Sequence, residues 1–272
     1  LVMPDADAGC AVLPTLRNWA PGKSVNEGLL ADLLDDPEAQ AAHVKNVVEL
    51  CTERGFDGVD LDYRGVGVEQ RESFTSFVGE LANALHDADK SLSVTVERPV
   101  LVDGTWETGG YDLKALGSAA DTVRVTFPSD PEAYATDGRA HRLLDWVTAQ
   151  VPRRKLHMAT SSLSARLNEA TGVYDFVSTA EALAPFGEVS ILDEVSDVEP
   201  QTEVALGLSG SLLSTVAKAE AGTYALRHKT EEGETCTTWL GTAANLAHKL
   251  AWAQRYQLGG VVVNDALNPG NA

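Results

Sequence analysis

The ten residues from Gly55 to Arg64, with the sequence GFDGVDLDYR, constrain the fold of this chain more than any other stretch. Side chains of a strand alternate between its two faces, so Asp60, Asp62 and Arg64 share one face and the apolar residues between them share the other. Burying such charges is costly unless they are paired or used. Two interpretations are open: an edge strand with a solvated polar face, or a strand whose charged face lines a site.

Strand-like and helix-like segments alternate along the rest of the chain. The apolar spacing predicts further strands at residues 11–16, 92–96, 123–127, 155–160 and 259–263. It predicts helices at residues 37–54, 74–85, 113–119, 143–151 and 243–256. Strands separated by helices indicate a parallel sheet with right-handed crossovers, and continuous runs such as VVV at 261–263 fit the buried strands of a (β/α) barrel.

The expected organisation is one α/β domain over residues 1–272. Between about 167 and 235 the alternation loosens, which predicts a less regular insertion with extra strands or a hairpin, including a polar turn at 231–234. No linker or low-complexity tract interrupts the sequence.

Charge and composition restrict the partners. Forty acidic residues against 21 basic ones give a formal net charge of −19, which argues against nucleic acid and tolerates a neutral partner such as a glycan. No apolar run approaches the roughly 20 residues of a membrane span, and the first thirty residues lack the pattern of a signal peptide.

Three cysteines are too few for a disulfide scaffold, and no Cys or His pair has metal-ligand spacing, so we expect neither a metal nor a cofactor. Cys10 precedes the first strand and Cys51 lies near the end of the helix that follows it. These points share one end of a βα unit, so a Cys10–Cys51 bridge and a buried free thiol are both open.

The run from Phe56 to Tyr63 resembles the DGxDxDxE signature of glycoside hydrolase family 18, which includes chitinases and spore-cortex-lytic glucosaminidases. The resemblance extends in order over most of the chain, through residues 12–18, 111–121 and 239–261. It implies a TIM (β/α)8-type barrel with the signature at the end of strand four. The first strand predicted here would then be strand three, so the barrel is expected to lack, or to have truncated, its first two βα units.

The same resemblance implies substrate-assisted chemistry, in which the substrate's own 2-acetamido group attacks the anomeric carbon. The middle Asp of the signature orients that group, and the final Glu protonates the leaving oxygen. In this chain Arg64 takes the place of that Glu. A guanidinium stays charged and is a poor proton donor, so it cannot serve as the general acid.

Three other strand ends also depart from the family pattern. The Tyr and Asp of the family's "YD" motif fall on Pro128 and Ser129, the tryptophan of the last strand falls on Asn264, and an aromatic position falls on Leu163. We expect these coordinated changes to have removed the family's chemistry.

The candidate catalytic positions are Asp60, Asp62 and Arg64, with Arg64 inactivating and expected to form an ion-paired cluster with both aspartates. Glu97, just after a strand, is the best substitute acid, and Asp130 and Asp265 are lesser ones. The candidate ligand-binding residues are Asn18, Trp19, Trp106, Ser129 and Asn264. Trp19 and Trp106 either stack on sugar faces at the barrel mouth or pack on neighbouring loops, whereas Trp146, Trp239 and Trp252 are expected in the core.

The sequence therefore predicts a catalytically impaired family 18-like domain, a pseudoenzyme that binds N-acetylglucosamine-containing glycan or peptidoglycan. One alternative is an active glycosidase of shifted specificity that uses Asp62 or Glu97, and another is a structural or interaction domain of a larger protein. The resemblance implies a secreted or cell-surface location.

Overall fold

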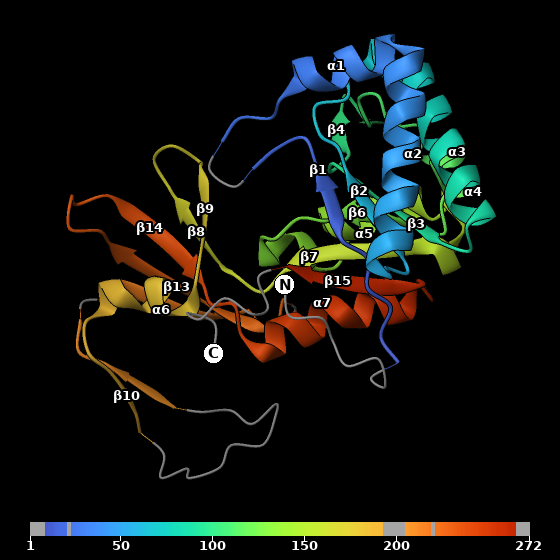
Figure 1. Cartoon of the computed structure of the whole chain (residues 1–272). Coiled ribbons are helices and arrows are strands. Elements are labelled where there is room, and N and C mark those ends of the chain that lie inside the picture. Colours follow the sequence, from blue (N-terminus) through green and yellow to red (C-terminus); the bar gives the residue numbers. More distant parts are fainter. Residues whose placement is uncertain (1–8, 21–22, 193–204, 211, 219–220, 265–272) are drawn as a thin grey trace. The chain divides into compact units, whose positions relative to one another are not determined.

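The computed structural model describes residues 9–20, 23–192, 205–210, 212–218 and 221–264 (Figure 1). The chain divides into two compact units. Unit 1 comprises Leu1–Thr126, Leu143–Met158 and Gln257–Gly260, and unit 2 comprises Phe127–Arg142, Ala159–Tyr256 and Val261–Ala272. The single barrel domain expected over residues 1–272 stays a prediction.

A central parallel sheet organises the fold, in the strand order β1-β2-β3-β6-β7-β15. Its strands are β1 (Thr15–Arg17), β2 (Gly58–Asp62), β3 (Ser91–Val96), β6 (Thr122–Thr126), β7 (Leu156–Ser161) and β15 (Gly260–Asn264). The pairs β1–β2, β2–β3 and β3–β6 are parallel. The predicted α/β class with a parallel sheet is therefore confirmed.

Barrel closure is not found. Among the described residues, β1 and β15 are the two edges of an open six-stranded sheet. The first strand is also shorter than expected, because β1 begins at Thr15 rather than at residue 11. The expectation that two leading βα units are missing stays a prediction.

Helix α2 (Pro37–Arg54) follows α1 (Glu27–Asp35) and shows how local sequence sets its ends. The Asp36 carboxylate accepts hydrogen bonds from the backbone nitrogens of Glu38 and Ala39, at 2.9 and 3.2 Å, and Pro37 occupies the first helical position. The helix ends at Gly55, whose φ of +68° is a left-handed conformation that favours glycine. The helix predicted at residues 37–54 is therefore confirmed with the same bounds.

Helix α3 (Arg71–Asp87) packs beside α2 on one face of the sheet (Figure 1). Its apolar residues recur at three- and four-residue spacing and are fully buried: Phe74, Phe77, Val78, Leu81 and Leu85. Val59 and Leu61 of β2 are also fully buried. The apolar face of β2 therefore belongs to the core.

Unit 1 also carries a β-hairpin of β4 (Val100–Val102) and β5 (Thr105–Glu107), followed by α4 (Leu113–Ala119). Helix α5 (Arg139–Val147) follows later in the chain. Cys51 of α2 is a buried free thiol, so the Cys10–Cys51 bridge is not formed.

Unit 2 contains a five-stranded antiparallel sheet in the order β12-β13-β14-β8-β9. Its strands are β8 (Ser164–Asn168), β9 (Tyr174–Val177), β12 (Ser214–Lys218), β13 (Thr223–Lys229) and β14 (Thr235–Trp239). The other elements are α6 (Thr179–Leu183), the pair β10 (Val189–Ile191) and β11 (Leu206–Leu208), and α7 (Ala243–Arg255). The polar turn expected at 231–234 joins β13 to β14, where the backbone nitrogen of Thr230 donates to the carbonyl of Glu234.

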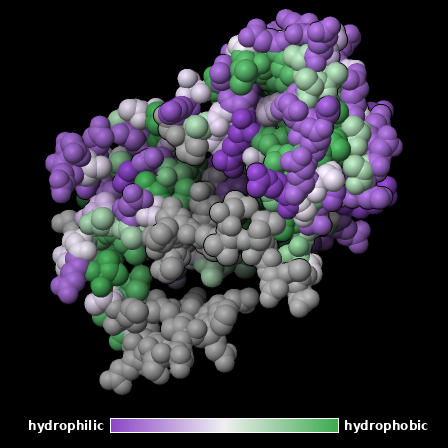
Figure 2. Space-filling view, viewed as in Figure 1, coloured by the Kyte–Doolittle hydropathy of each residue, from purple (hydrophilic) through white to green (hydrophobic). Residues whose placement is uncertain are grey.

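The outward side of α2 is largely hydrophilic, as Figure 2 shows. None of the helices in the described ranges is both long enough and apolar enough to span a bilayer.

One cation is buried in unit 2. Lys249 of α7 is 1% exposed, and its Nζ donates to the carbonyl oxygens of Ser129 and Ser161, each at 3.3 Å. Burial lowers its pKa from 10.5 to about 8, although the negative charge of Asp130 acts in the opposite direction.

The buried ammonium predicts a pH-dependent stability. Between about pH 8 and pH 10.5 the unfolded chain keeps a proton on Lys249 that the folded chain has released, so the free energy of unfolding should rise with pH across this window. Lys249→Met should remove this rise, which amounts to about 3 kcal/mol. Urea denaturation at several pH values between 7 and 10 measures it.

The matched control is Lys45→Met, a lysine that is 72% exposed on α2 and should keep the native slope. Equal slopes for the native chain and Lys249→Met would contradict the prediction.

Candidate functional site

The carboxyl end of β2 holds two buried carboxylates on the face opposite the core. Asp60 is 2% exposed and Asp62 is 5% exposed. The strand alternation predicted this shared face, and the register of β1 and β2 places Thr15 opposite Asp60 and Arg17 opposite Asp62. Two buried negative charges this close require cations or hydrogen-bond donors nearby.

Asp60 is held by side chains from three neighbouring strands. Its Oδ2 lies 3.2 Å from Nη1 of Arg124 on β6, and the hydroxyls of Thr15 and Thr95 donate to the carboxylate at 3.3 and 3.1 Å. These contacts occupy both carboxylate oxygens. Asp60 therefore ties β1, β2, β3 and β6 together at this level of the sheet.

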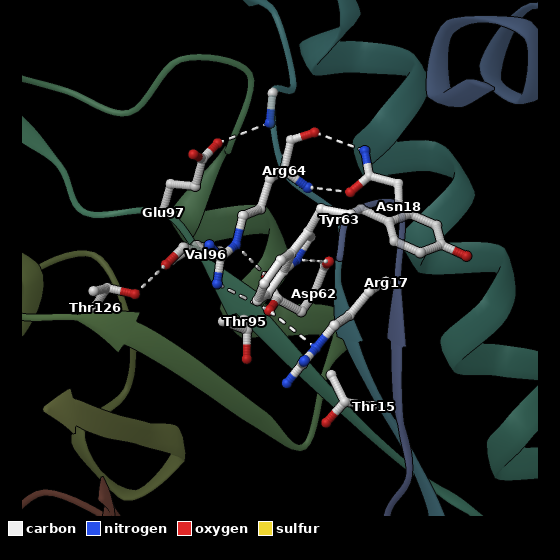
Figure 3. A network of polar contacts seen from close by, with 12 residues as sticks. Thr15, Arg17, Asn18, Asp62, Tyr63, Arg64, Thr95, Val96, Glu97 and Thr126 are labelled. Carbon is white, nitrogen blue, oxygen red and sulfur yellow. Dashed lines mark hydrogen bonds and ion pairs between the residues drawn. The ribbon is translucent and has the colours of Figure 1, made fainter. Parts of the chain in front are cut away.

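Asp62 is bound by Arg64 in a two-pronged ion pair. Nε of Arg64 donates to Oδ1 at 3.0 Å and Nη2 donates to Oδ2 at 3.2 Å, and Figure 3 shows the Arg64 side chain turned back toward Asp62. The guanidinium of Arg17 approaches Oδ2 from the other side at 3.8 Å. Asp62 is thus an acceptor with both oxygens in use.

Trp19 completes this arrangement. Its ring centroid lies 3.7 Å from the guanidinium carbon of Arg64 and 4.5 Å from that of Arg17. Its indole nitrogen donates to the backbone carbonyl of Asp62 at 3.2 Å. Trp19, Asp62, Arg64 and Arg17 form one unit of side chains, called here the strand-end cluster.

The backbone of residues 64 and 65 is fixed from two sides (Figure 3). Asn18 donates from Nδ2 to the carbonyl of Arg64 at 2.8 Å, and its Oδ1 accepts from the Arg64 nitrogen at 2.9 Å. Oε2 of Glu97 accepts from the Gly65 nitrogen at 2.8 Å. Asn18 and Glu97 therefore position the segment that carries Arg64.

The hydroxyl of Tyr111 contacts the Glu97 carboxylate and helps to fix its position. Its hydroxyl lies 3.1 Å from Oε2 of Glu97 and 2.7 Å from the carbonyl of Tyr63, within donating distance of both. Burial, with the negative charge of Glu97, raises the pKa of the Tyr111 hydroxyl well above its usual range. Tyr111 therefore stays protonated and remains a donor at neutral pH.

Tyr63 points to the core side of β2, where its hydroxyl lies 2.7 Å from Nε2 of His43. Burial raises the pKa of Tyr63 to about 12 and lowers the pKa of His43. This pair packs against Phe77 and stabilises the layer under the cluster.

The expected single cluster of Arg64 with both aspartates is wrong in one respect. Arg64 pairs with Asp62, whereas the cationic partner of Asp60 is Arg124. Sequence reasoning missed Arg124, Thr15 and Thr95, because they reach Asp60 from other strands. The one available signal was the arginine at position 124, which interrupts the apolar run VRV.

The other candidate residues lie apart from this group. Trp106 of β5 packs against Trp146 of α5, with ring centroids 5.9 Å apart, and no described contact joins it to Arg64. Ser129 and Asn264 belong to unit 2, where their carbonyls accept from Lys249 and from the nitrogen of Ser162. Their role in ligand binding stays a prediction.

Of the two lesser candidate acids, Asp130 and Asp265, the structure describes only Asp130. Asp130 caps a short helical turn by accepting from the nitrogen of Ala133, and it pairs with Arg139 at 2.8 Å. Asp265 lies outside the described residues. In the part of the chain that the structure describes, no group of three or more His, Cys, Asp or Glu side chains could hold a metal ion.

Comparison with known proteins identifies the family. The model of the glycosyl hydrolases family 18 matches residues 21–266 of this chain. The chain belongs to this family. The predicted resemblance is thereby confirmed.

One curated relative is the "putative sporulation-specific glycosylase YdhD" of Bacillus subtilis (strain 168), which is 22% identical over 252 residues. The alignment covers 90% of this chain and 55% of YdhD, so the chain spans about half the length of this relative.

Solved structures share the fold of this family 18 chain at low identity. The crystal structure of YdhD superposes with a TM-score of 0.70 at 19% identity, covering 92% of this chain and 78% of YdhD's. A chitinase from Chromobacterium violaceum ATCC 12472 gives 0.71 at 20% identity, covering 93% and 74%. The GH18 chitinase from Cycas revoluta in complex with (GlcNAc)3 gives 0.61 at 17% identity, covering 93% and 75%.

The buried ion pair between Arg124 and Asp60 predicts a large and non-additive effect on stability. Arg124→Met leaves the Asp60 carboxylate buried without its cation and should cost about 3–5 kcal/mol in the free energy of unfolding. Adding Asp60→Asn removes the stranded charge and should recover most of that loss. Urea denaturation of both single variants and the double variant measures the coupling.

Arg17→Met is the control, because the Arg17 side chain is 42% exposed and its 3.8 Å pair should contribute less than about 1 kcal/mol. The prediction fails if Arg124→Met costs no more than this control.

Proposed function

We propose that this chain is a family 18 domain with impaired or absent hydrolysis that binds N-acetylglucosamine-containing glycan. The observation that carries the proposal is Arg64, which occupies the position of the family's general acid and is bound to Asp62 through both carboxylate oxygens. A guanidinium does not release a proton to a leaving oxygen at accessible pH. The step that the family assigns to this position therefore has no donor.

The pairing also bears on Asp62. Among positions 60, 62 and 64, the resemblance gives the middle one, Asp62, the task of orienting the substrate's acetamido group. Here its two oxygens accept hydrogen bonds from Arg64, with Arg17 beside them. A substrate would have to displace a charge-assisted pair to use this carboxylate, which weighs against Asp62 as orienting group or as acid.

Binding has better support than catalysis. The Arg64 side chain is 36% exposed, and its Nη1 has no partner among the described residues, so it can donate to a hydroxyl or carbonyl oxygen of a sugar. The half-buried ring of Trp19 stacks against the Arg64 guanidinium and holds this donor in place. A structural relative binds (GlcNAc)3 and YdhD is named as a glycosylase, which guides the choice of ligand class. A secreted or cell-surface location is part of the same proposal.

One observation favours a second candidate, an active glycosidase of shifted specificity. The Glu97 carboxylate is fixed by the Gly65 nitrogen and the Tyr111 hydroxyl, close to the backbone of Arg64, while its Oε1 has no partner in the described part of the chain. An oriented carboxyl group at a strand end could act as an acid.

A third role, as a structural domain of a longer protein, predicts no saturable glycan binding.

The decisive measurement is turnover and binding by the same purified chain. We expect the native chain to bind N-acetylglucosamine hexamer in calorimetry while releasing no shorter oligomers detectable by mass spectrometry. Trp19→Ala should weaken binding about tenfold or more, because it removes the ring that holds the Arg64 guanidinium in place. Hydrolysis by the native chain that Glu97→Gln abolishes would overturn the proposal in favour of the second candidate.

Arg64→Glu and Arg64→Met separate the lost acid from the lost ion pair. Arg64→Glu restores a carboxyl group at the family position, and any hydrolysis it gains should exceed that of Arg64→Met, up to the roughly 10²-fold that a general acid supplies. If both variants hydrolyse the hexamer equally, and faster than the native chain does, release of Asp62 rather than the lack of an acid limits hydrolysis.

A further inference from the structure

A pocket in unit 1 lies outside the strand-end cluster. It has a volume of about 440 Å³, and the side chains of Trp106 on β5 and Trp146 on α5 are among its walls. None of Asp60, Asp62 and Arg64 lines it. The volume falls within the range of small-ligand sites, roughly 300–1,000 Å³. We refer to it as the tryptophan pocket.

The two indoles provide the apolar part of this pocket. Their centroids are 5.9 Å apart, their planes are inclined by 31°, and both residues line the same pocket. Both side chains are half-buried, although the sequence led us to expect Trp146 in the core. Neither indole nitrogen has a hydrogen-bond partner among the described residues. Each ring therefore offers an apolar face and a free donor.

The rest of the lining is polar and balanced in charge. Arg71 and Lys114 contribute two cations, and Glu107 and Asp112 contribute two carboxylates. Although the whole chain carries a formal charge of −19, this pocket has no net charge from these four groups. Mixed donors and acceptors around aromatic faces suit an uncharged, hydroxyl-rich ligand better than an anion or a cation.

Two of these polar groups are held in place. Nη2 of Arg71 donates to the carbonyl of Gly109 at 2.6 Å and to the hydroxyl of Thr108 at 3.4 Å. Oδ1 of Asp112 accepts from the nitrogens of Lys114 and Ala115, which leaves Oδ2 open. The pocket therefore has fixed polar positions next to its aromatic walls, as a preorganised binding site needs.

We propose that the tryptophan pocket is a second saccharide-binding site, which takes a neutral pyranose by stacking it on Trp106 and Trp146. The surrounding side chains bind its hydroxyls. This site goes beyond the proposed function, which concerns the strand-end cluster; only the choice of N-acetylglucosamine hexamer as the probe rests on that function. Tyr111 lines the pocket and its hydroxyl reaches Glu97, so it is the residue the pocket shares with the network at the strand ends.

The test is calorimetry of the full chain with N-acetylglucosamine hexamer, comparing variants of the two sites. The native chain should bind at two sites. Trp106→Ala and Trp146→Ala should each abolish one of them, or weaken it at least tenfold, and leave the other unchanged. Trp19→Ala should have the complementary effect. The conservative Trp146→Phe, which keeps a stacking surface, should retain measurable binding at the pocket and guards against a folding defect in Trp146→Ala.

Trp252→Ala, a tryptophan of α7 in unit 2, is the matched control and should leave both sites intact. Near-ultraviolet circular dichroism verifies that each variant is folded. Unchanged affinity and stoichiometry in folded Trp106→Ala would overturn the inference while the proposed function stands. Complete loss of binding in Trp106→Ala, with none lost in Trp19→Ala, would support sugar binding at the tryptophan pocket. It would also show that the strand-end cluster does not bind the hexamer.

The preference of the tryptophan pocket for an uncharged ligand can be tested separately. An oligogalacturonate of similar length, which carries a carboxylate on every ring, should not bind the tryptophan pocket. Binding of this acidic probe through Trp106 with no binding of the neutral hexamer would overturn the assignment to a neutral sugar.

Discussion

The ion pair between Arg64 and Asp62 is the interaction on which the end of the sheet depends. It fixes a cation at the end of β2 and uses both oxygens of the neighbouring carboxylate. Trp19 stacks on the same guanidinium, so the aromatic group of the site is oriented by the pair as well. Together with Arg124 on Asp60, the result is two buried carboxylates that each have their own arginine. These pairs balance the charge of both carboxylates and hold the strands together at this level of the sheet.

The elements that depend on local sequence could be predicted well. The Asp36 cap, Pro37 and Gly55 define α2, and the spacing of apolar residues defines α3, because these signals act within a few residues of one another. Closure of the sheet could not be predicted in this way. Whether β15 meets β1 depends on pairing between distant segments, and the described residues form an open sheet.

The site residues also divide into those set by local sequence and those set by pairing between distant segments. The shared face of Asp60 and Asp62 follows from the two-residue period of a strand, and both are buried as that period implies. Arg124 comes from a strand two positions away, so only the register of β3 and β6 reveals it. Trp106 precedes α4 in the sequence, but the β4–β5 hairpin brings it onto Trp146, a contact that no spacing rule predicts.

The Asn18 amide has a consequence for substitutions at position 64. It binds the peptide N–H and C=O of residue 64 and not the arginine side chain, while Glu97 accepts a hydrogen bond from the next backbone nitrogen. The backbone at position 64 is thus held by hydrogen bonds that do not depend on which side chain stands there. The side chain at position 64 can therefore be exchanged without removing the hydrogen bonds that hold its backbone. A substitution at this position is accordingly expected to change the charge at the strand end more than the path of the backbone.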